Sequence, residues 1–143
     1  MFMGEYRHSL DAKNRLIIPA KFRDELGSTF VVTKGLDGCL TVYTEEQWTA
    51  LVHQLEQLPT TKREVRQYVR FLLSKAVECQ FDSQGRIQLP QVLVDAAQID
   101  KKCTVIGAAD HIEIWSDEKW DAYESEAGES FESVAESLTE FLR

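Results

Sequence analysis

The sequence has few cysteines and no long apolar run. Its three cysteines are odd in number, widely spaced and never arranged as Cys-x-x-Cys, which argues against a disulfide framework and against a zinc ribbon. We expect buried or half-buried thiols, and neither a metal nor a cofactor. No segment approaches the roughly 20 apolar residues of a membrane span, and residues 1–6 lack the apolar core of a signal peptide. The sequence therefore predicts a cytoplasmic protein without a membrane partner.

Positive charge is also scarce. The chain has 16 Lys and Arg against 24 Asp and Glu, for a formal net charge of −8, whereas proteins that bind phosphates usually show an excess of cations. The charge is uneven, however, because residues 1–23 contain five cations and two acids, and residues 116–143 contain nine acids and two cations. Only charges within about a Debye length, roughly 10 Å, act on a polyanion. A basic face is therefore compatible with the acidic total.

One short phrase occurs twice in the chain. Residues 11–19 and 82–90 both read Asp-x-x-x-Arg, apolar, x, apolar, Pro. The similarity continues downstream, where each half has an apolar segment followed by a tryptophan (residues 40–43 and Trp48; residues 112–115 and Trp120). Two repeats of roughly seventy residues are too long and too few for a solenoid. We interpret them as a duplicated unit that presents one functional loop in each half.

Apolar periodicity and turn residues predict the same order of elements in both halves. The first half is expected to have strands 5–9 and 16–18 joined as a hairpin, helix 20–26, hairpin 30–43 and a Thr-capped helix from residue 44. The second half is expected to have a strand ending near residue 81, a strand to residue 89, helix 91–97, hairpin 103–115 and a helix from residue 117. The predicted units are repeat 1–59, connecting helix 60–76, repeat 77–123 and acidic helix 124–143.

The connecting helix 60–76 is basic and amphipathic. Lys62, Arg66 and Arg70 recur every four residues beside an apolar stripe. One interpretation is a solvated charged face over a packed stripe, and the other is a set of auxiliary phosphate contacts.

The Asp-x-x-x-Arg segments are the candidate functional loops. An Asp at the first position can accept hydrogen bonds from backbone N–H groups two or three residues on, so Asp11 and Asp82 are expected to fix their loops. The Arg four residues later carries a fork of donors that suits a phosphate or guanine O6 and N7. From spacing alone, an Asp–Arg salt bridge that only pins a hairpin is equally well supported.

The two loops differ in composition. Lys13 and Asn14 add a cation and an amide to the first loop, whereas the second has Gln84 and Gly85 at these positions. We therefore expect Lys13 and the arginine of the first loop to matter more for binding than Arg86.

At these residues the chain resembles the MraZ proteins of bacteria, which are related in fold to the transition-state regulator AbrB and to MazE-type antitoxins. The resemblance runs from Met1 to about Ala122. It implies a mainly β, α+β fold, namely a duplicated swapped-hairpin AbrB-like barrel of two pseudo-symmetric halves with peripheral helices. It also implies a ring-shaped homo-oligomer.

The resemblance further implies a nucleoid-associated regulator that binds double-stranded DNA sequence-specifically. Its target would be the promoter of the division and cell-wall gene cluster, including its own gene, read at repeated upstream boxes. We predict DNA contacts by five residues of the N-terminal segment and the two loops: Arg15, Lys13, Arg86, Asn14 and Arg7.

Two other classes of protein compete with this interpretation. An enzyme is disfavoured because His8, His53 and His111 lie far apart and neither a nucleophile elbow nor a glycine-rich phosphate loop is present, so we expect no small-molecule substrate. The stronger alternative is a ring-forming interaction scaffold, or an antitoxin-like subunit, without direct DNA readout. We also expect an oligomer because Trp48, Trp115, Trp120 and the last helix offer a large apolar surface.

Overall fold

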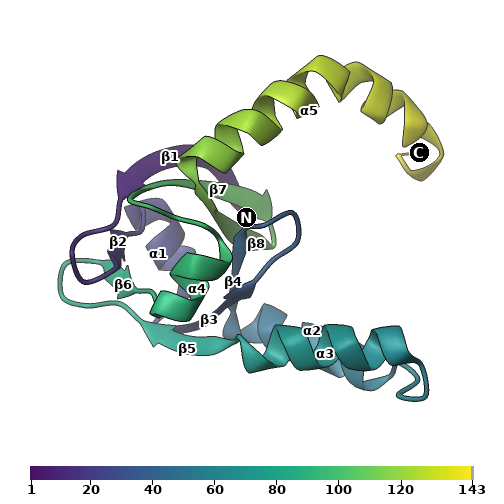
Figure 1. Ribbon diagram of the computed structural model, residues 1–143, viewed down its shortest axis with the longest axis horizontal. Coiled ribbons are helices and arrows are strands. Elements are labelled where there is room, and N and C mark those ends of the chain that lie inside the picture. The colour runs from purple at the N-terminus through teal and green to yellow at the C-terminus, as the bar shows by residue number, and fades with distance from the viewer. Residues whose placement is uncertain (143) are drawn as a thin grey trace.

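The computed structural model describes residues 1–142. Its centre is a six-stranded antiparallel sheet, and a separate two-stranded ladder lies at one end (Figure 1). The strands are β1 Phe2–Ser9, β2 Arg15–Ile17, β3 Thr29–Lys34, β4 Leu40–Thr44, β5 Val77–Gln80, β6 Arg86–Gln88, β7 Lys102–Ala109 and β8 His111–Ser116. The helices are α1 Ala20–Leu26, α2 Glu45–Glu56, α3 Arg63–Ser74, α4 Gln91–Ala96 and α5 Asp117–Ser137, followed by the 3₁₀ turn η1 Thr139–Phe141.

The order of strands in the sheet is symmetric about its centre. The order is β1-β7-β8-β4-β3-β5, and exchanging each strand for its counterpart in the other half (β1 with β5, β7 with β3, β8 with β4) only reverses it. The ladder β2–β6 takes one strand from each half, and β1 of the first half pairs with β7 of the second. The fold is therefore the predicted duplicated α+β fold of two interlocked, pseudo-symmetric halves.

The predicted hairpin of strands 5–9 and 16–18 is wrong. β1 pairs along its whole length with β7, with Arg7 opposite Thr104, and β2 pairs with β6. Only the loop between β1 and β2 closes locally, because the Asp11 N–H donates to the Arg15 carbonyl at 3.0 Å. Alternation of apolar residues specifies a strand and its buried face but not its partner. The hairpins β3–β4 and β7–β8 are confirmed.

The helices follow the sequence closely at their N-termini, with one exception. α1 has the predicted bounds, and the Thr44 side chain caps α2 by accepting from the Gln47 N–H at 3.1 Å. The connecting helix starts at Arg63 rather than residue 60, because Pro59 begins a turn whose carbonyl accepts from the Lys62 N–H at 3.2 Å.

The last helix joins two segments that the sequence predicts as separate units. α5 runs unbroken from Asp117 through the predicted boundary at residues 123/124 to Ser137. Arg143, at the end of predicted unit 124–143, lies outside the described residues. None of the helices within residues 1–142 is both long and apolar enough to cross a membrane.

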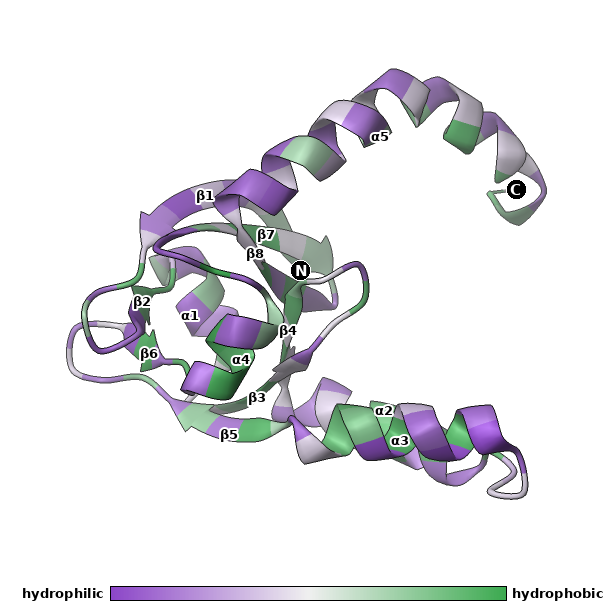
Figure 2. Cartoon of the chain, in the orientation of Figure 1, coloured by the Kyte–Doolittle hydropathy of each residue, from purple (hydrophilic) through white to green (hydrophobic). Residues whose placement is uncertain are grey.

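The core lies between the central sheet, the β2–β6 ladder and the two short helices α1 and α4. Phe22 of α1, Leu93 of α4 and the ladder residues Leu16 and Ile87 are fully buried. Figure 2 shows the hydrophobic residues concentrated in this body, whereas α5 is mostly hydrophilic. The three cysteines are buried and unpaired, as expected.

The tryptophans supply less surface than expected. Trp115 is only 3% exposed and packs within its own chain against Trp120 and Tyr123, with ring centroids 5.3 and 4.9 Å away. The expectation that Trp115 offers an apolar surface for assembly is therefore wrong.

The ladder generates a prediction about stability. Leu16 lies opposite Ile87 in the β2–β6 register and is fully buried, so Leu16→Ala should lower the free energy of unfolding by about 2–5 kcal/mol. The neighbouring Ile17 is 45% exposed, and Ile17→Ala should change it by no more than about 0.5 kcal/mol. Urea denaturation at a fixed protomer concentration measures both. Equal losses would mean that the ladder is not part of the core.

Candidate nucleic-acid interface

Both Asp-x-x-x-Arg loops fold around the aspartate. Oδ1 of Asp11 accepts from the N–H groups of Lys13 and Arg15, each at 2.9 Å, and Oδ2 accepts from Arg15 Nε at 2.6 Å. In the second loop, Oδ1 of Asp82 accepts from the N–H groups of Gln84 and Arg86 at 2.9 Å, and Oδ2 accepts from Arg86 Nε at 2.8 Å. The two aspartates thus make equivalent hydrogen bonds in the loops of the two halves.

These hydrogen bonds also lower the pKa values of the two aspartates. Donation from the backbone N–H of Arg15, reinforced by its side chain, lowers the pKa of Asp11 to about 2. The corresponding bonds from Arg86 lower the pKa of Asp82. Both carboxylates are therefore charged at neutral pH and hold the arginines that follow them.

The residue before each arginine joins the loop to the other half. Asn14 and Gly85 both have a left-handed backbone, with φ of 58° and 74°, a conformation that Asn and Gly adopt most readily. The Asn14 carbonyl accepts from the Leu89 N–H at 2.9 Å, and the Gly85 carbonyl accepts from the Ile18 N–H at 3.2 Å. Each loop is therefore held by the strand that leaves the opposite loop.

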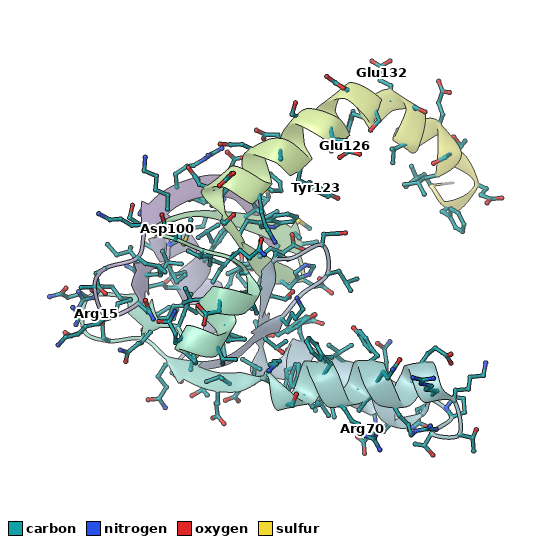
Figure 3. The ribbon with its side chains drawn as sticks, viewed as in Figure 1. Arg15, Arg70, Asp100, Tyr123, Glu126 and Glu132 are labelled. Atoms are coloured by element: carbon teal, nitrogen blue, oxygen red, sulfur yellow. The ribbon has the colours of Figure 1, made fainter. Side chains whose placement is uncertain are left out.

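This exchange brings the two loops to one end of the molecule. In Figure 1 they lie side by side at the left edge, away from α2, α3 and the far end of α5, and Figure 3 shows Arg15 at this edge. Nη1 of Arg86 lies 3.6 Å from Oδ2 of Asp11, so the carboxylate of the first loop contacts the arginines of both. The structure thus brings together Asp11, Asp82, Lys13, Asn14, Arg15 and Arg86.

The two arginines are not equally available. Nε of Arg15 is bound by Asp11, but among the described residues no hydrogen bond or ion pair involves its Nη1 or Nη2. The side chain of Arg15 is 32% exposed, whereas that of Arg86, which contacts both aspartates, is 21% exposed. Lys13 is exposed at the tip of the first loop.

Arg23 is a cation of this surface that the sequence analysis did not single out. Its Nη1 donates to the Ile18 carbonyl at 2.6 Å, and a Cβ added to Gly85 would lie 2.6 Å from the same atom. Arg23 of α1 therefore lies against the second loop. No repeat or spacing could have identified it, because Val94 occupies the corresponding position of the second half.

The predicted contact residue Arg7 lies in a different cluster. Its guanidinium donates to Asp117 at 2.9 Å, Asp121 at 2.8 Å and Glu5 at 3.2 Å, and the bond with Asp121 is the main cause of its raised pKa. Arg7 thus ties the first turns of α5 to β1. The side-chain amide of Asn14 is also engaged, because its Nδ2 donates to Oε1 of Gln91 at 2.9 Å.

Comparison with known proteins identifies relatives over the full length of the chain. The family described as "MraZ protein, putative antitoxin-like" matches twice, at residues 1–71 and 72–142. Proteins named "Transcriptional regulator MraZ" from Ligilactobacillus salivarius (strain UCC118) and Natranaerobius thermophilus are each 52% identical over 141 residues, covering 99% of both chains. One of the same name from Desulforamulus reducens is 49% identical over 142 residues, covering 99% of this chain and all of its own.

The hydrogen bonds accepted by the Asp11 carboxylate predict that the stability of the fold depends on pH. Because the pKa of Asp11 is lowered from 3.8 to about 2 in the folded chain, its contribution is complete above about pH 4 and is lost as the pH falls toward 2. Asp11→Asn should therefore be less stable than the wild type at neutral pH, and the gap should narrow below about pH 4. Urea denaturation across this range measures the gap. If the difference in stability between the wild type and Asp11→Asn stays constant with pH, the charge of Asp11 does not stabilise the loop. The control is Ser83→Ala, which removes no charge, so its difference from the wild type should not narrow at low pH.

Proposed function

The chain belongs to the MraZ family, and on that premise we propose that it is a transcriptional regulator that binds double-stranded DNA sequence-specifically through its paired Asp-x-x-x-Arg loops. The observation that carries the proposal is the pairing of the two loops at one end of the fold, where Nε of Arg15 is held and its Nη1 and Nη2 have no hydrogen-bond or ion-pair partner within residues 1–142.

The contact with Asp11 holds the Arg15 side chain in an orientation that suits DNA binding. Oδ2 of Asp11 takes Nε of Arg15 and leaves the outer edge of the guanidinium, formed by Nη1 and Nη2, for an acceptor. Two parallel N–H groups on that edge match guanine O6 and N7, or two phosphate oxygens. In the sequence, the salt bridge and the DNA contact are alternative interpretations. Because they use different nitrogens of Arg15, both can form at the same time. Holding the arginine in advance lowers the entropic cost of binding.

A ring of protomers accounts for binding by an acidic protein. One protomer presents a few cations at its loops, Lys13, Arg15, Arg86 and Arg23, against a net charge of −8. A homo-oligomeric ring would gather several such ends on one face and multiply the local field that acts on phosphates. Repeated boxes in DNA suit successive protomers, since the spacing of DNA sites mirrors the symmetry of the protein.

The resemblance to the MraZ family supports a proposal for the biological target. We propose that the protein acts in the cytoplasm, in association with the nucleoid. Its target there is the promoter of the division and cell-wall gene cluster, including its own gene.

The proposal predicts unequal effects of the two arginines. Arg15→Ala should weaken binding to a duplex from the gene's own upstream region by about 5–150-fold for each protomer contact, which corresponds to about 1–3 kcal/mol. Arg86→Ala should cause a smaller loss, because its side chain is already shared between two aspartates. Fluorescence anisotropy against the upstream duplex and a shuffled duplex measures both.

Two results would separate the alternatives. Lys119→Ala removes one cation from α5 rather than from the loops and serves as the control, with affinity expected to match the wild type. If Arg15→Ala also binds like the wild type, the first loop does not read DNA. If the wild type binds neither duplex at low salt while remaining oligomeric, the interaction scaffold becomes the better interpretation.

The exposed Lys13 generates a second prediction. No acidic partner of Lys13 is found within residues 1–142, and we expect this lysine to contact phosphate, which adds affinity without sequence preference. Lys13→Ala should therefore weaken binding to the upstream and shuffled duplexes by similar factors. It should also reduce the slope of log affinity against log salt by about one for each protomer bound. An unchanged salt slope would show that Lys13 does not contact phosphate.

A further inference from the structure

The far half of α5 has an apolar stripe that the protomer leaves uncovered. No residue of α5 is buried, and Figure 1 shows the helix leaving the body as a separate arm. Phe131 is 71% exposed and Val134 is 50% exposed, and Leu138 and Phe141 continue the same stripe at spacings of four and three. A helical arm without tertiary packing is only marginally stable in water. We therefore expect a partner surface to cover this apolar stripe.

The base of α5 is fixed, so the arm has a defined direction. Arg7 binds Asp117 and Asp121, and Tyr123 packs against Trp115 with ring centroids 4.9 Å apart. Beyond Glu124, α5 makes no hydrogen bond or ion pair to the rest of the described chain. The helix is held out from the body rather than folded against it.

The outer face of α3 is a second uncovered surface, and it is basic. Phe71 is 50% exposed, and Nζ of Lys34 and of Lys75 lie 5.8 and 5.6 Å from the centroid of its ring. Together with Tyr68 and Arg70, Phe71 lines an open hollow along this face. Figure 3 shows Arg70 on the side of α3 turned away from the body. Residues 60–76 contain five cations and one acid.

The two surfaces are complementary in charge as well as in polarity. The apolar stripe of α5 runs among glutamates, at positions 124, 126, 129, 132, 136 and 140. The aromatic patch of α3 is bordered by three cations, Lys34, Lys75 and Arg70, and by one acid, Glu64. Opposite charges around matching apolar strips give an interface both affinity and orientation.

The internal duplication indicates what α5 lacks. α2 and α5 occupy equivalent positions, because each follows the strand of a hairpin, is capped by a hydroxyl, and has a tryptophan near its start (Trp48 and Trp120). α3 lies against α2 and closes an apolar groove with it, lined by residues that include Val52, Leu55 and Val69. Within the described residues, no helix covers α5 in this way.

We propose that the far half of α5 docks on the outer face of α3 of a second copy of this chain. The arms α5 and α3 of one protomer share no hydrogen bond or ion pair within residues 1–142 and leave the body separately in Figure 1. The donor and acceptor faces differ, so the contact is head-to-tail and repeats from copy to copy until it closes. The inference rests on the ring of the proposed function and names the surfaces that build it.

The test uses two variants with one damaged face each. The donor variant carries Phe131→Ser and Val134→Ser on α5, and the acceptor variant carries Arg70→Glu and Phe71→Ser on α3. All four side chains are exposed, so the fold should survive, and near-ultraviolet circular dichroism of the tryptophans checks it. The matched control is Val92→Ser on α4, because Val92 is 49% exposed and lies outside both faces.

Light scattering at micromolar concentration should give an oligomer for the wild type and for Val92→Ser. Each damaged variant alone should have the mass of a single 16.4 kDa chain. A 1:1 mixture of the two should have twice that mass and grow no further, because one intact donor face meets one intact acceptor face. This recovery also shows that both variants are folded.

Three results would overturn the inference. If either damaged variant keeps the wild-type mass, these faces do not build the oligomer, although the ring of the proposed function stands. If the mixture stays monomeric, the intact α5 face of one variant does not bind the intact α3 face of the other. A monomeric wild type would remove both the inference and the ring, whereas DNA binding through the loops is measured separately by anisotropy.

Discussion

The surface formed by the two loops depends on one interaction, in which a carboxylate binds two backbone N–H groups and the Nε of the arginine four residues on. It occurs once in each half, at Asp11 and Asp82, with nearly identical distances. Without it, Arg15 would be a flexible side chain on a turn. With it, the turn is closed, the carboxylate stays charged, and the guanidinium is held at Nε, while Nη1 and Nη2 have no partner among residues 1–142.

The exchange of strands between the halves turns two such loops into one surface. Each loop binds the strand that leaves the other, through the carbonyls of Asn14 and Gly85, and Asp11 reaches Arg86 directly. Because the halves are duplicated, the second loop has the same backbone hydrogen bonds as the first, but its other side chains differ. The first loop has the exposed Lys13, whereas Arg23 lies against Gly85 of the second. One fold thus presents two related but unequal loops.

Local features of this fold could be predicted from the sequence, and long-range partners could not. The bounds of α1 and the Thr44 cap depend on residues within a few positions of each other, and the Asp-x-x-x-Arg bracket is local as well. The partner of β1 is about a hundred residues away, and nothing in its alternation of side chains identifies it. Arg7 counts as one more cation in the basic N-terminal segment, but the fold places it against Asp117 and Asp121. Trp115 likewise lies beside Trp120 only after α5 has turned back on β8.

Replacement of Arg15 by lysine tests the central claim most directly, because it keeps the charge and removes the fork and the Nε that Asp11 holds. Anisotropy of Arg15→Lys should show affinity for the shuffled duplex close to that of the wild type and a clear loss of affinity for the upstream duplex, so that the preference between them falls. A variant that keeps the full preference would contradict readout by the bracketed guanidinium and would reduce the first loop to a source of positive charge.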